Sequence, residues 1–287
     1  MWSLDNVSSL QQITPATVAS SIKLYQPRDG YRTQSGPAFL GPQIEYYLPA
    51  PPSDTVKIEI LDAKGVVVNS YRSDAPPAPV GRGGRGGGGD PDDPENAMLE
   101  GRPGRGGAAG APLNIATKNV GLNRFVWGVQ HSTGLGAPPG TYQARLTVGS
   151  TTQTVPFNVL IDPRLAADGV TAADLRAQYE HNAKMRDMVA DGSAQVQRVR
   201  AQETRLKSAT GAAADTAARV KAISEKLNTP PIRYSKPALQ SHITYLASMT
   251  TRVDQKVGKD ALSRYAQLRK ELDAIKAELD KLFPPKM

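Results

Sequence analysis

Cysteine is absent from the 287 residues of the chain, and histidine is scarce, with three residues. Without cysteine there are no disulfide bonds, thiolate nucleophiles or Cys-ligated zinc and iron–sulfur sites. His131, His181 and His242 lie far apart in sequence, and none belongs to an HExxH or HxH motif, so we predict no metal site. No apolar run approaches the ~18 residues of a membrane-spanning helix, and the first twelve residues lack the basic and apolar regions of a signal peptide.

The formal net charge of +8 is confined to one part of the chain. Residues 1–162 carry 13 Lys and Arg against 13 Asp and Glu, whereas residues 163–287 carry 22 against 14. Such an excess fits an acidic partner, for example nucleic acid, lipid headgroups or an anionic polysaccharide. The basic residues are dispersed and not clustered, which favours the alternative that they solvate the outer faces of a helical domain.

Glycine is unevenly distributed, because twelve of the 26 glycines lie between Gly81 and Gly110. The surrounding segment, 76–112, has too little apolar mass to offset the entropy of ordering, so we predict a disordered insertion. Its GRGGRG run matches the dinucleotide-binding GxGxxG pattern, but no helix follows it. Its arginines resemble an RNA-binding box, but the acids of 90–95 would repel nucleic acid. The same acids suggest a calcium site, but they lack the glycine of an EF-hand loop. We therefore predict no cofactor and no specific nucleic-acid partner.

Apolar and polar residues alternate before and after this insertion, with the period of two that is typical of strands. Lys64 and Gly65 interrupt the alternation as the tight turn of a hairpin. About seven short strands with turn signals between them indicate an immunoglobulin-like β-sandwich over residues 36–162. The apolar positions of the alternation are Ile44, Tyr46, Leu48, Val56, Ile58, Ile60, Tyr142, Ala144, Leu146, Val148, Val155, Phe157, Val159 and Ile161.

From residue 163 the apolar period changes to 3.6, which predicts about four helices in an antiparallel bundle, or alternatively an open coiled coil. Thr171 is a candidate N-cap with Asp174 three residues later, as in a capping box. Gly192 lies within the first long helix, costs it ~1 kcal/mol and is a candidate bend. The residues expected to face inward are Met185, Val189, Val196, Val199, Leu206, Val220, Ile223, Leu227, Leu239, Ile243, Leu246, Val253, Val257, Leu262, Tyr265, Leu268, Leu272, Ile275, Leu279 and Leu282.

Side chains capable of chemistry are few. Glu45 and Glu59 are acids on predicted strands, but each lies opposite an apolar face, where solvent exposure is the usual state. Trp127 is expected to pack in the core, with a sugar-stacking platform as the alternative. No Ser/His/Asp arrangement is present, so we predict no catalytic residue. The tyrosines in or beside the helices are expected to pack: Tyr179, Tyr234, Tyr245 and Tyr265.

Several segments, in order, resemble the C-terminal part of bacterial sortilin-like proteins with neuraminidase-type (BNR) propeller repeats, a family often labelled glycosyl hydrolase. The segments are WSLDNVSSL (2–10), LYQPRDGYR (24–32), YYLP (46–49), IEILD (58–62), GLNRFVW (121–127), PGTY (139–142) and DPR (162–164). The middle segments are also similar to the Ig-like domain of flagellar hook-capping proteins. Gly128 departs from the family pattern, which often has an acid after the tryptophan.

The resemblance implies three parts: a remnant of the last propeller strand and a linker (1–35), an Ig-like sandwich (36–162) and a helical bundle (163–287). It implies an exported protein, periplasmic or secreted. Because Met1 falls inside the closing propeller strand, the chain is expected to be a C-terminal fragment of a longer protein, or the product of a gene with a lost or misplaced start. The expected function is a non-catalytic accessory module that contacts the parent's propeller through Trp2 and Leu4, and binds protein or glycan. Two alternatives remain: part of an exo-sialidase-like hydrolase whose active site lies in the missing propeller, or a basic helical domain that binds polyanions or a cell surface.

Overall fold

The computed structural model describes residues 7–14, 21–33, 41–75, 115–230, 232 and 234–284. Among these residues the chain forms two compact units: a β-rich unit that extends to Tyr179 and a helical unit that begins at Glu180. The predicted propeller contacts Trp2 and Leu4, and the glycine-rich insertion 76–112 with its motifs, lie outside the described residues.

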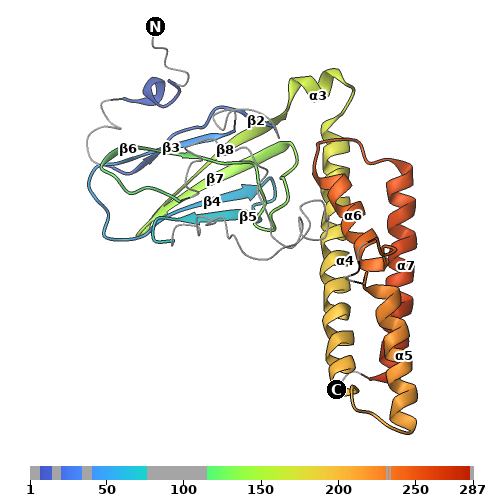
Figure 1. Cartoon of the computed structure of the whole chain (residues 1–287). Helices are drawn as coiled ribbons and strands as arrows, with labels where there is room; N and C mark the ends of the chain where they lie inside the picture. Colours follow the sequence, from blue (N-terminus) through green and yellow to red (C-terminus); the bar gives the residue numbers. More distant parts are fainter. Residues whose placement is uncertain are drawn as a thin grey trace. The chain divides into compact units, whose positions relative to one another are not determined.

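Two β-sheets form the β-rich unit after a short 3₁₀ helix, η1 (Leu10–Gln12) (Figure 1). The first sheet has the order β1-β3-β6, from β1 (Lys23–Leu24), β3 (Gln43–Leu48) and β6 (Gly121–Val126). The second has the order β2-β8-β7-β4-β5, from β2 (Gly30–Arg32), β4 (Val56–Asp62), β5 (Val67–Arg72), β7 (Gly140–Val148) and β8 (Thr151–Ile161). Their strand pairs are antiparallel, except that β2 runs parallel to β8. The β4–β5 hairpin turns at Gly65, whose φ of 81° suits glycine, as the sequence predicts.

The two sheets share one hydrophobic core, because the alternating apolar residues of both enter the same cluster. Trp127 is fully buried there, and its ring lies edge-on to Tyr142 at 5.0 Å and to Phe157 at 6.0 Å. Its Nε1 donates to the carbonyl of Gln130 at 3.1 Å. The prediction that Trp127 packs in the core is confirmed, and a fully buried ring offers no platform to a sugar.

Residues that we predicted as a linker form part of these sheets. β1 pairs with β3, and β2 pairs with β8. Arg32 on β2 is buried, and its Nη1 donates to the carbonyls of Gly136 at 2.9 Å and Ala137 at 2.7 Å. The β-structure therefore begins before the predicted boundary at residue 36. The five-stranded sheet curls into a half-barrel and does not lie flat as in a regular sandwich. The immunoglobulin-like topology therefore stays a prediction.

The C-terminal region contains five helices in its described residues, where the sequence predicts about four. They are α3 (Pro163–Ala167), α4 (Ala172–Arg205), α5 (Ala212–Leu227), α6 (Leu239–Thr251) and α7 (Lys259–Leu282). The capping box ahead of α4 is confirmed: the backbone N–H of Asp174 donates to Thr171 Oγ1 at 3.1 Å, and the Thr171 N–H donates to Asp174 Oδ2 at 3.0 Å. β-structure followed by helices is therefore the observed architecture.

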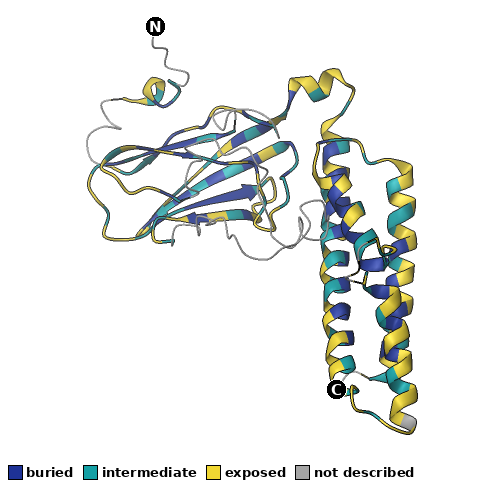
Figure 2. Ribbon diagram, in the orientation of Figure 1, coloured by how far each residue is buried: buried dark blue, intermediate teal, exposed yellow. Residues whose placement is uncertain are grey.

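The helical unit has its own apolar core, with the buried residues of α4 to α7 turned toward one another (Figure 2). α4 continues through Gly192, where a Cβ would collide with the side chain of Gln240 on α6. Glycine at this position therefore leaves room for the end of the Gln240 side chain. Two inward predictions are wrong: Val253 is 54% exposed and Leu262 is 48% exposed. Val253 lies beyond the end of α6, and Val257 is only half-buried in the segment that follows.

Candidate functional site

The first candidate acid, Glu45, lies on β3 and faces away from the apolar core, since Ile44 and Tyr46 alternate with it. The predicted solvent exposure is wrong, because its side chain is only 3% exposed. Arg124, its register partner on β6, donates from Nη2 to Glu45 Oε1 at 2.6 Å. A cross-strand ion pair thus covers this carboxylate.

The second candidate acid, Glu59, lies on β4 and is also buried, with a side chain 8% exposed. Its carboxylate binds Arg145 Nη2 at 2.8 Å and Lys57 Nζ at 2.7 Å. Burial acts to raise the pKa of Glu59, but hydrogen bonds from Lys57 and Arg145 outweigh it and lower the pKa. Glu59 is therefore held as an anion and has no proton to donate near neutral pH.

The two acids do not form a catalytic pair. Glu45 belongs to the three-stranded sheet and Glu59 to the five-stranded sheet. Each alternates with residues of the shared core, so they lie on the outer faces of the two sheets, with the core between them. A glycosidase needs two carboxyl groups that face each other ~5–9.5 Å apart.

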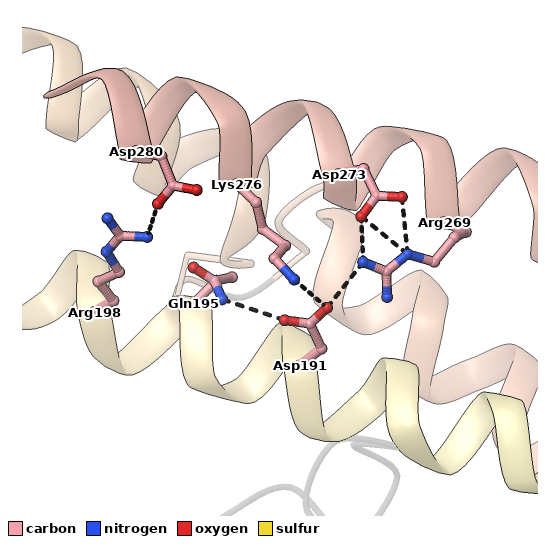
Figure 3. A network of polar contacts seen from close by, with 7 residues as sticks. All are labelled: Asp191, Gln195, Arg198, Arg269, Asp273, Lys276 and Asp280. Atoms are coloured by element: carbon pink, nitrogen blue, oxygen red, sulfur yellow. Dashed lines mark hydrogen bonds and ion pairs between the residues drawn. The ribbon is translucent and has the colours of Figure 1, made fainter. Parts of the chain in front are cut away.

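A polar network joins α4 to α7 in the helical unit (Figure 3). Asp191 accepts hydrogen bonds from Lys276 Nζ at 2.8 Å, Arg269 Nη2 at 2.9 Å and Gln195 Nε2 at 3.2 Å. Arg269 also pairs with Asp273 on its own helix. Burial acts to raise the pKa of Asp191, but the hydrogen bonds from Lys276, Arg269 and Gln195 outweigh it and lower the pKa.

The same helices are joined a turn further along, where Arg198 Nη1 binds Asp280 at 2.6 Å. Lys276, Arg269 and Arg198 are thus cations with carboxylate partners inside the unit. These contacts stabilise the bundle and do not form a site for an external anion.

The histidines are distributed between the units. His131 contacts Tyr179 in the β-rich unit, with ring centroids 5.9 Å apart. His181 on α4 is 4% exposed and lies edge-on to Tyr265 at 5.8 Å, and burial and the charge of Lys184 lower its pKa. Within the described residues, no three side chains of His, Asp or Glu are grouped so as to hold a metal ion.

Helix α6 buries part of its apolar side chains and exposes two large ones. Large apolar side chains lie on its solvent side: Tyr245 is 56% exposed, Met249 is 50% exposed, and Val253, at the same spacing just beyond the helix, is 54% exposed. We call these three residues the α6 strip. The inward face combines the apolar residues Leu239, Ile243 and Ala247 with polar ones, namely Gln240, Thr244, Ser248 and Thr250.

The α6 helix carries almost no charge, whereas the segment that follows it is rich in charged residues. α6 itself, LQSHITYLASMTT, has no acidic or basic residue besides His242. Exposed basic side chains follow at its end, Arg252, Lys256 and Lys259. Two acids lie in the same segment: Asp254 is buried, and Asp260, next to Lys259, is exposed. The strip is thus uncharged and is followed by a segment with charges of both signs, in which exposed basic residues outnumber exposed acids.

Sequence reasoning did not find the α6 strip. Packing was predicted for four tyrosines: it is confirmed for Tyr179 and Tyr265 but wrong for Tyr245, and Tyr234 is 90% exposed. The signal available was the complete lack of Lys, Arg, Asp and Glu over residues 239–251 within a segment that is otherwise rich in charge.

No family model, curated protein or solved structure matches this chain. Among the helices that the structure describes, none combines the length and the apolar character needed to cross a membrane. The functional argument therefore rests on two observations: the exposure of the α6 strip, and the ion pairs that hold Glu45 and Glu59.

Proposed function

We propose that this chain is a non-catalytic interaction module, an accessory part of an exported bacterial sortilin-like protein with BNR propeller repeats. In this proposal the β-rich unit is an immunoglobulin-like sandwich, and the module works outside the cytoplasm. The observation that carries the interaction role is the α6 strip, three large apolar side chains that are each at least 50% exposed. Large exposed apolar patches on folded proteins commonly mark sites of protein interaction.

The structural use of the acids supports a non-catalytic role for this chain. Glu45 and Glu59 are each covered by an arginine from the neighbouring strand. General acid catalysis requires a carboxyl group that stays protonated at the working pH. The lowered pKa of Glu59 is the opposite of that requirement.

The test of the proposed partner is a titration of this full chain with the propeller domain encoded next to it in its genome, followed by isothermal calorimetry. The proposal predicts saturable binding with one chain per propeller. The absence of propeller repeats in the neighbouring sequence, or the absence of binding, would overturn the propeller partnership.

The hydrolase alternative has a separate test, the release of a fluorophore from a sialoside substrate by the chain alone. We expect no turnover above the rate in buffer. Turnover that is lost in Glu45→Gln or Glu59→Gln would replace the proposal by a hydrolase with its acids on these strands.

The polyanion alternative is distinguished by retention on heparin. The cations of the Asp191 network are already paired inside the helical unit, so we expect weak retention that ends at moderate salt. Retention that persists at high salt would favour a specific polyanion site.

A further inference from the structure

We infer that the outer edge of β6 pairs with the β6 strand of a second copy of the chain, so that the three-stranded sheets of two copies join into one continuous antiparallel sheet. The occupant of this edge is thus a strand of identical sequence, related by a twofold axis. The inference concerns a different surface from the α6 strip. It goes beyond the proposed function, because it depends neither on a propeller nor on any other partner.

The hydrogen bonds of the three-stranded sheet show which way the backbone groups of β6 are directed. Tyr25 N–H donates to the carbonyl of Glu45 at 3.0 Å, so the backbone of Glu45 is directed toward β1 and away from β6. Arg124 is the register partner of Glu45, and its N–H and C=O are therefore directed away from β3. Beyond the end of the strand, Trp127 N–H donates to the carbonyl of Pro42 at 3.0 Å, which gives the same alternation.

Three residues of β6 consequently direct their N–H and C=O groups to the outer edge: Leu122, Arg124 and Val126. Within the described chain, β6 is hydrogen-bonded to β3 alone, and these outward backbone groups have no protein partner. The register between β3 and β6 runs without a bulge over all six residues of the strand. The edge is therefore a regular row of donors and acceptors, which is the template for another strand.

The other edges of the two sheets are closed or shorter. The outer edge of β1 is bound by the side chain of Gln153, which accepts from Leu24 N–H at 2.8 Å and donates to the carbonyl of Ile22 at 2.7 Å. The edge of β5 is covered where Ser132 N–H donates to the carbonyl of Val68 at 2.9 Å. The edge strand β2 has only three residues. Among the described strands, β6 therefore has the longest open edge.

The side chains of β6 do not protect this edge against pairing. Edge strands are commonly protected by lysine, proline or a bulge, and β6 (GLNRFV) has none of these. Its one charged residue, Arg124, is paired with Glu45. Leu122 is 46% exposed, and Val120, just before the strand, is 58% exposed. Exposed apolar side chains thus accompany the unpaired backbone groups, as expected of an edge that is used.

Two features select a second copy as the occupant. A twofold axis places two β6 strands antiparallel, so the outward N–H groups of each copy meet the outward C=O groups of the other. Residues 1–162, which include both sheets, carry 13 basic and 13 acidic residues, so these parts of two copies have no net charge and do not repel each other. A register with Leu122 opposite Arg124 of the second copy also avoids placing two arginines face to face.

Sedimentation velocity of the full chain over a wide range of concentrations tests the association. We expect a reversible equilibrium between monomer and dimer at micromolar concentrations. The measurement is made at physiological salt, where the charges of the helical units are largely screened. A monomer at every concentration would overturn the inference.

A charged substitution on the edge locates the dimer contact. Leu122→Lys places a lysine beside the outward backbone groups, and we expect it to weaken the dimer at least about tenfold. The matched control is Val66→Lys, which adds the same charge at a 61% exposed apolar residue of the β4–β5 hairpin and should leave the dimer unchanged. Both variants should keep the melting temperature of the wild type, because both positions are exposed. An equal loss of the dimer in both variants would overturn the assignment to β6.

Amide hydrogen exchange followed by NMR distinguishes strand pairing from other modes of association. The N–H groups of Leu122 and Arg124 should exchange more slowly as the concentration rises, because the dimer adds a hydrogen bond to each. The N–H groups of Asn123 and Phe125 should be protected at every concentration, because they are directed toward β3. A dimer without this alternation would contradict the pairing of β6.

Further outcomes separate the other occupants. A dimer that is lost in Tyr245→Gln/Met249→Gln but kept in Leu122→Lys would assign self-association to the α6 strip and overturn the inference. Protection of Leu122 and Arg124 that appears only when the propeller is added to a monomeric chain would assign the edge to a propeller strand, and would also overturn it. A monomer that binds the propeller refutes the inference and leaves the proposed function intact. A dimer that does not bind the propeller refutes the propeller partnership and leaves the inference intact.

Discussion

Replacement of Asp191 by asparagine tests whether the polar network stabilises the helical unit. Asp191→Asn keeps the shape of the side chain but removes its charge from two ion pairs, with Arg269 and Lys276. The exposed fraction is 20% for the Asp191 side chain, 29% for Arg269 and 34% for Lys276, so solvent screens both ion pairs in part. Exposed pairs contribute ~0.2–1 kcal/mol each, and hydrogen bonds to charged groups contribute somewhat more. We therefore expect the free energy of unfolding to fall by about 1–2 kcal/mol.

The assay is urea unfolding at pH 7, followed by circular dichroism at 222 nm, for the wild type, Asp191→Asn and the control Asp187→Asn. Asp187 is 70% exposed and forms an ion pair with its neighbour Arg186, so its variant should match the wild type. A stability of Asp191→Asn equal to that of the control would refute the contribution of the network.

The pH dependence of Asp191→Asn provides a second check on the same residue. The pKa of Asp191 is lowered from its ordinary value of 3.8, so the unfolded state binds the proton more readily. The stabilisation is therefore present above pH 3.8 and is lost as the pH falls through the lower pKa of the folded state. The difference between the wild type and Asp191→Asn should shrink below pH 3.8. A difference that stays constant to pH 2 would contradict the electrostatic origin.

Three further predictions concern single positions. His181 has a lowered pKa, so the wild type should lose stability as the pH falls from 6.5 toward 5, whereas His181→Phe should show a flatter profile in urea unfolding; equal slopes would refute this. Gly192→Ala should be more favourable by about 1 kcal/mol when Gln240 is also alanine, because the collision with Gln240 is removed and the helix propensity gain remains; additive effects in a double-mutant cycle would contradict the close approach. Thr171→Ala should cost ~1 kcal/mol in thermal unfolding through loss of the capping box, and an unchanged melting temperature would argue against it.

The strands and long helices could be predicted because their signals are local. Alternation places Ile44, Tyr46 and Leu48 on one face of β3, and the structure buries all three. The capping box of Thr171 and Asp174 depends on residues three apart and is confirmed. Neither conclusion needs knowledge of distant parts of the chain.

The burial of the strand acids could not be predicted from the same pattern. Alternation places Glu45 on the outer face, but its exposure depends on Arg124, which lies 79 residues away in sequence. Only the pairing of β3 with β6 brings the two side chains together. The arginine then covers the carboxylate, so an outward position does not imply an exposed one.

The orientation of α6 could be predicted, because Leu239, Ile243 and Leu246 were expected to face inward, and the structure buries the first two and packs the third against the same core. Ile243 and Ala247 are spaced as Tyr245 and Met249 are, and the bundle buries the first pair. The periodicity was extended too far, to Val253, because α6 ends at Thr251. The Thr251 hydroxyl donates to the carbonyl of Ala247 at 2.8 Å, the type of side-chain contact that competes with helix continuation.

The central claim is that two large apolar residues of α6, Tyr245 and Met249, face solvent, and the unfolding free energy of Tyr245→Gln/Met249→Gln tests it most directly. The comparison is Ile243→Ala, which removes a fully buried side chain from the opposite face of the same helix. We predict that the strip variant stays within about 0.5 kcal/mol of the wild type, while Ile243→Ala loses about 2–5 kcal/mol. A loss in the strip variant as large as that in Ile243→Ala would show that Tyr245 and Met249 pack within the chain, and would contradict the account.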